Sequence, residues 1–194
     1  PTFTQKDKKL GRATTKKYDL VTVLFCDIQG FTKIAQTLNP EVLIDKLDTF
    51  FFHFDTVIGK YNIEKIKTIG DAYMCAGGIP RKNSTNPVEV ILAALEMLDY
   101  MMELKKKESN IWDLRIGIHT GPVIAGVVGQ KKVSFDIWGD TVNTASRLES
   151  SGHANKINIS QETYHLVKKY FNFDHRGKMP VKYKGNIDMY FIES

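Results

Sequence analysis

The chain has 194 residues, of which 42% are hydrophobic and 25% are charged, and its formal net charge is +5. This composition predicts a single domain with a core of ordinary size. No run reaches the roughly 18 unbroken apolar residues of a membrane span, no signal peptide is recognisable, and two cysteines are too few for a disulfide framework. We therefore expect buried thiols, a reducing compartment and a domain that faces the cytoplasm.

Residues 1–17 form a polar, basic segment that we interpret as a solvated linker or arm ahead of a domain over residues 18–194. It holds six basic residues against Asp7 alone. Nucleic-acid binding is the alternative, but no further basic stripe with interleaved aromatics follows, so no nucleic-acid partner is expected. Because the chain begins at Pro1, we expect a regulatory domain upstream in a longer protein, which could itself be attached to a membrane.

The first half of the domain alternates strands and helices. "YDLVTVLFCD" predicts a buried strand that Gly30 ends, and an Asn39-Pro40 cap opens a helix over about 40–59 with apolar residues at helical spacing. The runs "NIEKIKTIG" and "AYMCAGGI" predict two strands joined by a Gly70-Asp71 hairpin turn. A second amphipathic helix is expected from Asn86 to about 107.

In the second half, "WDLRIGIHT", "PVIAGVVG" and "KVSFDIW" predict three strands, followed by a helix in "GDTVNTASRLESSG" that closes near Gly152. Two more strands, at "KINIS" and "IDMYFIE", flank a helix over about 161–169 and the unassigned stretch "FNFDHRGKMPVKYKG". Several neighbouring strands have connections too short for a helical crossover. We therefore predict an α+β fold with a ferredoxin-like βαββαβ core, a mixed, mainly antiparallel sheet, and helices covering one face.

Two carboxylates end apolar runs, Asp27 after the first strand and Asp71 in the hairpin turn. If the two strands are neighbours, these carboxylates lie close together and require a shared proton or a cation. The alternative is that Asp27 caps a short helix near Phe31 and Asp71 serves the turn. Between Asp27 and that helix, Gly30 permits a sharp turn whose N–H groups can hold a phosphate. A hard cation next to a phosphate indicates nucleotide chemistry.

The runs "VLFCDIQGFT", "EKIKTIGDAYM", "LRIGIHTGPVIAGVVG" and "FDIWGDTVNTASRLES" resemble the catalytic domain of the class III nucleotidyl cyclases over about residues 18–193. The resemblance implies two Mg²⁺ ions, replaceable by Mn²⁺, held by Asp27, Asp71 and the carbonyl of Ile28. One ion helps to deprotonate the ribose 3′-OH for attack on the α-phosphate, and the other stabilises the departing pyrophosphate.

The same resemblance assigns the substrate contacts. Gly30, Phe31 and Thr32 would cradle the phosphates, Gly70 of the hairpin joins the substrate-binding set, and Arg115 and Lys182 match basic phosphate contacts. Asn143 would orient the ribose, and Arg147, one helical turn later, would stabilise the transition state. The structural alternatives are a buried ion pair for Arg115, a solvated lysine for Lys182 and an exposed helix face for Asn143 and Arg147.

Lys67 and Asp136 match the family's base-reading positions. Lys67 can donate to N1 of adenine and Asp136 can accept from its N6 amino group, whereas guanylyl cyclases typically carry Glu and Cys there. We therefore predict an adenylyl cyclase that converts ATP to cyclic AMP. The neighbouring residues look as much like guanylyl cyclases, so a guanylyl cyclase is the runner-up.

Two further classes of protein are alternatives to an active cyclase. A catalytically silent dimerisation domain would have lost a metal aspartate or a transition-state residue, and Asp27, Asp71, Asn143 and Arg147 are all present. A polymerase or diguanylate cyclase palm would carry a GG[DE][DE]F-like hairpin, which "TIGDAY" is not. Since one chain carries both halves of the family's shared site, the resemblance implies a head-to-tail homodimer.

Overall fold

The computed structural model describes residues 15–129 and 132–193. Its strands are β1 (Lys16–Ile28), β2 (Glu64–Ile69), β3 (Ala72–Gly77), β4 (Leu114–Val128), β5 (Ser134–Trp138), β6 (Lys156–Ser160), β7 (Phe173–Val181) and β8 (Gly185–Ile192). Its helices are α2 (Phe31–Thr37), α3 (Pro40–Lys60), α4 (Asn86–Lys107), α5 (Asp140–Ser150) and α6 (Gln161–Val167). Most of the predicted arm lies outside the described residues, but its last two, Lys16 and Lys17, belong to β1 and pair with β4.

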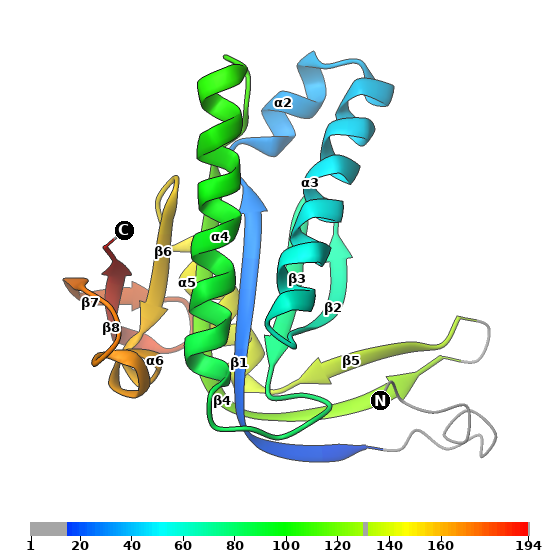
Figure 1. The fold of residues 1–194 in the computed structure, drawn as a ribbon. Helices are drawn as coiled ribbons and strands as arrows, with labels where there is room; N and C mark the ends of the chain where they lie inside the picture. Colours follow the sequence, from blue (N-terminus) through cyan, green and yellow to red (C-terminus); the bar gives the residue numbers. More distant parts are fainter. Residues whose placement is uncertain (1–14, 130–131, 194) are drawn as a thin grey trace.

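The eight strands form one sheet in the order β2-β3-β1-β4-β6-β8-β7, with β5 paired to β4 (Figure 1). Among the described strands only β4 and β6 pair in parallel, and the other pairs are antiparallel. The helices α3 and α4 each connect two of the four neighbouring strands β2, β3, β1 and β4, which gives the β1-α3-β2-β3-α4-β4 order of a ferredoxin-like core. The predicted α+β fold with a mainly antiparallel sheet is confirmed.

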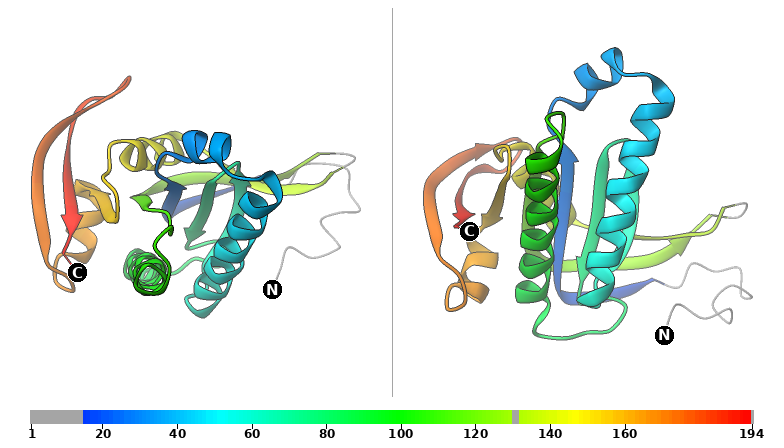
Figure 2. Two further views of the ribbon diagram at one scale, coloured as in Figure 1. Left: turned by 90° about the horizontal axis from the view of Figure 1, so that it is seen from above. Right: turned by 45° about the horizontal axis from the view of Figure 1, so that its top comes forward.

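Helices cover both faces of the sheet, so the expectation of one covered face is wrong. The side chains of β1 alternate between two buried clusters: Leu24 and Cys26 pack with α3 and α4, whereas Val23 and Phe25 pack on the other side with Ala145 of α5. Figure 2 shows α5 on the face opposite to α3 and α4. An unbroken apolar run, without polar alternation, is the pattern of a strand that is buried on both faces.

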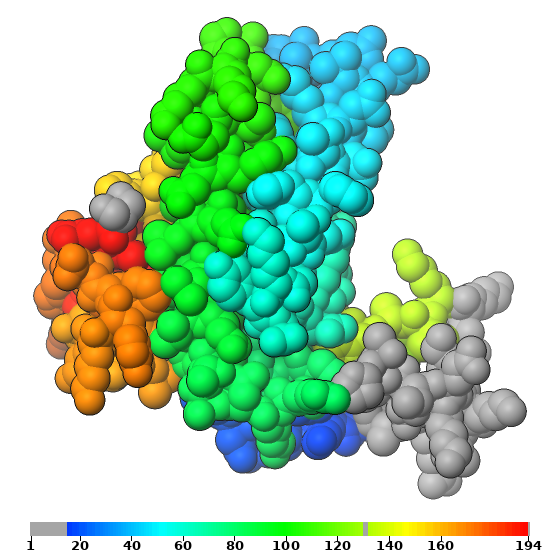
Figure 3. Space-filling view, viewed as in Figure 1, coloured from blue at the N-terminus to red at the C-terminus, as the bar shows by residue number. Residues whose placement is uncertain are grey.

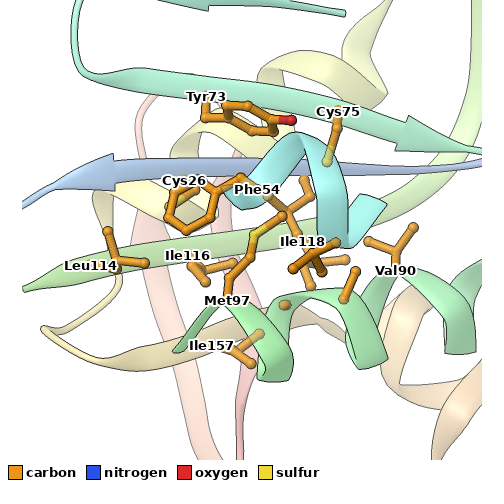
Figure 4. Close-up of a cluster of buried hydrophobic side chains, with 14 of the residues drawn as sticks. Cys26, Phe54, Tyr73, Cys75, Val90, Met97, Leu114, Ile116, Ile118 and Ile157 are labelled. Atoms are coloured by element: carbon orange, nitrogen blue, oxygen red, sulfur yellow. The ribbon is translucent and has the colours of Figure 1, made fainter. Parts of the chain in front are cut away.

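The larger cluster lies between the sheet and the pair α3 and α4, which run side by side over that face (Figure 3). Phe54 of α3 and Met97 of α4 are fully buried against the strands, together with Ile116 of β4 (Figure 4). The predicted buried thiols are confirmed, since Cys26 and Cys75 are free and lie in this core. Among the described residues, no helix is long and apolar enough to cross a bilayer.

Two details of the strand prediction are wrong. The runs "LRIGIHT" and "PVIAGVV" form one strand, β4, because Pro122 lies between the part that pairs with β6 and the part that pairs with β5, where its missing N–H costs no ladder bond. The stretch "FNFDHRGKMPVKYKG", for which the sequence pattern predicts no element, contains β7. Its Pro180 is tolerated because β7 is an edge strand.

Candidate active site

The end of β1 and the β2–β3 hairpin bring the two predicted metal aspartates together. Ile69 pairs with Ala72 across a two-residue turn in which Gly70 has φ +59°, a left-handed conformation that favours glycine. This turn places Asp71 at the end of β1, where its Oδ2 accepts a hydrogen bond of 3.0 Å from the N–H of Ile28. Asp71 therefore lies beside Asp27. It bonds to β1 as well as forming part of its own turn, so the alternative in which it serves the turn alone is not sufficient.

Arg115 joins this pair from the neighbouring strand. It lies opposite Asp27 in the β1–β4 register and donates from Nη2 to Asp27 Oδ2 at 3.0 Å and from Nε to Glu149 Oε1 at 2.8 Å. The structural alternative for Arg115, a buried ion pair, is therefore observed in part, since the ion pairs form and the guanidinium is partly buried. A direct phosphate contact by Arg115 stays a prediction.

Glu149 is the site residue that sequence reasoning missed. It comes from α5, whose backbone approaches β4 so closely that a Cβ on Gly117 would lie 2.0 Å from the Glu149 N atom. The signal was present in the pattern, because Ala145, Leu148 and Glu149 share the buried face of α5. An acidic residue at a buried position of an amphipathic helix indicates a charged partner.

The cluster carries more negative than positive charge. Burial raises the pKa of Asp71, and the charge of Asp27 raises it further. Burial and the adjacent Asp27 raise the pKa of Glu149 to about 8, against the opposing effect of Arg115. Three carboxylates thus face one guanidinium, which favours an additional cation or a bound proton.

One atom in the cluster points to a cation rather than a proton alone. Asp27 Oδ1 is buried and has no hydrogen-bond partner among the described residues. Hard cations such as Mg²⁺ take carboxylate oxygens as ligands and draw further ligands from water and substrate phosphates. Among residues 15–129 and 132–193, no group of three acidic, histidine or cysteine side chains is placed to hold a metal ion by itself, so such a cation would need further ligands from the backbone, water or substrate.

The turn between β1 and α2 contains the predicted phosphate loop. Gly30 has φ +71° and is the N-cap of α2, and its carbonyl accepts from the N–H groups of Lys33 and Ile34. No side chain caps this helix, so the alternative in which Asp27 is the N-cap is wrong. The ring of Phe31 packs edge-on against Trp112 at 6.2 Å. This packing fixes the first turn of the helix, including the backbone of Thr32.

Lys67 of β2 and Asp136 of β5 lie in direct contact. The Nζ of Lys67 donates to Oδ2 of Asp136 at 2.7 Å, while Oδ1 of Asp136 accepts from the N–H of Ile137. These two side chains are 69 positions apart in the sequence. Two residues predicted to read one base are thus held side by side, and a base that bound between them would replace their ion pair.

The remaining predicted residues lie on α5 and in the β7–β8 turn. Asn143 is exposed and Arg147 is partly exposed on the same face of α5. Lys182 is exposed in the turn, and both Lys182 and Arg147 contact the ring of Tyr183. Within one chain, neither Asn143 nor Arg147 is bonded to the carboxylate cluster, as far as the described residues show. The structure therefore presents two groups of predicted residues. The acidic group contains Asp27 and Asp71, and the basic group contains Arg147 and Lys182.

Comparison with known proteins identifies the family. The model of the adenylate and guanylate cyclase catalytic domain matches residues 13–194. An adenylate cyclase of Mycobacterium tuberculosis is 39% identical over 176 residues, which are 91% of this chain and 40% of that protein. Guanylate cyclase 32E of Drosophila melanogaster is also 39% identical, over 180 residues, which are 90% of this chain and 16% of that protein.

Among solved structures, the guanylate cyclase domain of RhGC from Catenaria anguillulae, in complex with GTP, is similar with a TM-score of 0.88 and 34% identity. The match covers 92% of this chain and 98% of that domain. This chain thus spans less than half the length of these two curated relatives and nearly the whole of a catalytic domain. The chain belongs to the family of adenylate and guanylate cyclase catalytic domains.

Proposed function

We propose that this nucleotidyl cyclase domain is an adenylyl cyclase, which converts ATP to 3′,5′-cyclic AMP and pyrophosphate at a site shared by two copies of the chain. The observation that carries the choice of ATP is the contact between Lys67 and Asp136, 2.7 Å apart. The ammonium group of Lys67 can only donate hydrogen bonds, and the ionised carboxylate of Asp136 can only accept them.

This donor and acceptor fit adenine at the positions that the family resemblance assigns. Lys67 would face N1 of the base, which is an acceptor in adenine but an N–H donor in guanine. Asp136 would face the exocyclic group, which is a donor in adenine and the O6 acceptor in guanine. Guanine would therefore set donor against donor and acceptor against acceptor, and unpaired buried polar groups make such a mismatch costly.

The acidic cluster would hold the metal ions. Asp27 and Asp71 would be carboxylate ligands, with the carbonyl of Ile28 as a further ligand. Two Mg²⁺ ions, when bound, would favour ionisation of the ribose 3′-OH and stabilise the charge of the departing pyrophosphate. Arg115 holds the Asp27 carboxylate in place, and Glu149 holds the guanidinium of Arg115.

The chain's own donors would bind the rest of the nucleotide. The N–H groups of Gly30 and Phe31, with Thr32, would hold the β- and γ-phosphates, because the first turn of a helix leaves its N–H groups unpaired. Asn143 would hydrogen-bond the ribose and so orient its 3′ oxygen for in-line attack. Arg147 would place its guanidinium where negative charge develops on the α-phosphate, and Lys182 would bind the phosphates beside it.

An exposed apolar surface supports assembly into a homodimer. The hairpin of β4 and β5 extends beyond the body of the molecule (Figure 1). Ile124 and Trp138 lie opposite each other on it and are 49% and 40% exposed, and Val128 on the same face is 44% exposed. Apolar side chains that are gathered on a projecting arm indicate a protein interface. We assign this arm to the head-to-tail contact that joins the acidic group of one copy to the basic group of its partner.

The decisive experiment is to incubate the purified domain with ATP and with GTP, each with Mg²⁺ or Mn²⁺, and to identify the cyclic product by chromatography and mass spectrometry. We expect cyclic AMP, with a kcat/KM for ATP at least about tenfold above that for GTP. A preference for GTP would instead identify a guanylyl cyclase, which is the alternative because this chain is equally similar to an adenylate and a guanylate cyclase. If a dimeric preparation forms no cyclic product, nucleotidyl cyclase activity is excluded for this domain.

A further inference from the structure

Tyr183, in the turn between β7 and β8, contacts both of the cations that the proposed function gives to the phosphates. Its ring centroid is 5.5 Å from the guanidinium carbon of Arg147 and 5.0 Å from Nζ of Lys182. Both distances are within the range of a cation–π interaction. One aromatic ring therefore contacts one cation from α5 and one from the turn itself.

The turn accounts for the backbone conformation of Tyr183 but not for a large aromatic residue at this place. The N–H of Lys184 bonds to the carbonyl of Val181, which closes a four-residue turn with Tyr183 at its third position, where glycine or asparagine is usual. The φ of Tyr183 is +66°, in the left-handed region that large side chains rarely adopt and that glycine or asparagine adopts more easily. The residue is 83% exposed, so the ring is not needed to fill the core. A strained backbone that carries an exposed aromatic ring suggests a role for that ring.

The turn is also anchored to the helix that carries Arg147. The ammonium group of Lys184 pairs with Asp140 in the first turn of α5, and the N–H of Lys184 bonds to the carbonyl of Val181 at 3.0 Å. These two contacts fix the residue after Tyr183. The ring therefore has a defined position relative to Arg147.

An aromatic ring holds a cation differently from a carboxylate. A carboxylate neutralises the charge and occupies the N–H donors, as Glu149 and Asp27 do with Arg115. A ring attracts the cation to its face and leaves the donors free for another anion. In the part of the chain that the structure describes, neither Arg147 nor Lys182 has a carboxylate partner.

We propose that Tyr183 is a positioning residue for polyphosphate binding. Its ring holds Arg147 and Lys182 close together, with their charges and their N–H donors available to the triphosphate of the nucleotide. This inference rests on the proposed function for its substrate, and it adds a residue that neither the cyclase motifs nor the comparisons assign. Preorganised cations bind an anion more tightly because less side-chain entropy is lost on binding.

The test compares Tyr183→Asn, which removes the ring but tolerates the left-handed backbone, with Tyr183→Phe, which keeps the ring. Tyr170→Asn is the matched control, because Tyr170 is also exposed and makes no contact with either cation. Two readouts are used: the Kd for tripolyphosphate by calorimetry, and KM and kcat for ATP. Thermal melting checks the fold of each variant.

We expect Tyr183→Asn to weaken tripolyphosphate binding about five- to tenfold, as two exposed cation–π contacts allow, and to raise KM while its melting temperature stays equal or rises. Tyr183→Phe and Tyr170→Asn should match the wild type. A Tyr183→Asn variant with wild-type Kd and KM would overturn the inference, and so would a Tyr183→Phe variant with the same defect as Tyr183→Asn. If Tyr183→Asn weakens tripolyphosphate binding but the wild type makes no cyclic nucleotide, the positioning role stands and the proposed function fails.

Discussion

The substitution Glu149→Gln tests the charge balance of the acidic cluster. Glu149 is 7% exposed, and burial together with Asp27 raises the pKa of its carboxyl to about 8. In the metal-free folded protein this group keeps its proton at neutral pH, whereas in the unfolded chain it loses the proton near its ordinary value of 4.5. Its stabilising effect is therefore complete below pH 4.5 and is lost as the pH rises toward 8.

The expected size follows from the number of protons that unfolding releases. One proton held by the folded state alone changes the free energy of unfolding by about 1.36 kcal/mol per pH unit. Between pH 5 and pH 8 this gives an upper limit of roughly 4 kcal/mol, and we expect about 2–3 kcal/mol because the side chain keeps some contact with water. Glutamine imitates the protonated carboxyl and cannot titrate, so the variant should lack this dependence.

The assay is urea unfolding of wild type and Glu149→Gln in EDTA at pH 5, 6, 7 and 8. The difference in unfolding free energy should increase with pH in favour of the variant, whatever constant offset the substitution adds. Glu193→Gln, at an exposed site, is the control and should run parallel to wild type. Added Mg²⁺ should reduce the pH dependence of the wild type, because a cation offsets the charge of the cluster. Parallel curves for wild type and Glu149→Gln would refute the reasoning.

Three further predictions concern activity. Asp27→Ala or Asp71→Ala should lower the rate of cyclisation at least about a hundredfold with the fold intact, because both carboxylates serve a cation. Near-normal turnover at saturating Mg²⁺ would contradict the assignment of these two residues as metal ligands. Lys67→Glu combined with Asp136→Cys should shift the ratio of kcat/KM for ATP and GTP toward GTP by at least about tenfold, and an unchanged ratio would show that other residues read the base. Asp71→Ala and Arg147→Ala should each be inactive alone but recover roughly a quarter of wild-type activity when mixed in equal amounts, because half of the dimers are mixed and each rebuilds one of two sites. A mixture that stays inactive where wild type is dimeric would contradict the shared site.

The sequence predicted those parts of the fold that depend on local patterns. The helix over 40–59 is α3 (Pro40–Lys60), and the side chain of Asn39 accepts a hydrogen bond from the N–H of Glu41 as a cap should. The Gly70-Asp71 turn was predicted because only two residues separate two strand-like runs. These features are set by neighbours in the sequence, so a single sequence contains them.

Features set by distant contacts were predicted less well. The continuity of β4 through Pro122 depends on which strands lie beside it, and the strand character of β7 depends on its place at the sheet edge. Glu149 belongs to the site because Gly117 of a neighbouring strand lets α5 approach. Its partner Arg115 is 34 positions away, and spacing within one motif carries no information on such a contact.

The distribution of charge within one chain gives a physical reason for a shared site. Around Arg115 the acidic side chains of Asp27, Asp71 and Glu149 outnumber one guanidinium, so this part attracts cations. Around Tyr183 two cations have no carboxylate partner among the described residues, so this part attracts anions. A nucleoside triphosphate with Mg²⁺ carries both kinds of charge, and neither group of side chains alone complements it. In the proposed head-to-tail homodimer each acidic group would face the basic group of the partner, and their attraction would favour the same orientation as the apolar arm. High salt should weaken this attraction and leave the apolar contact in place, because ions screen exposed charges but not buried hydrophobic surface.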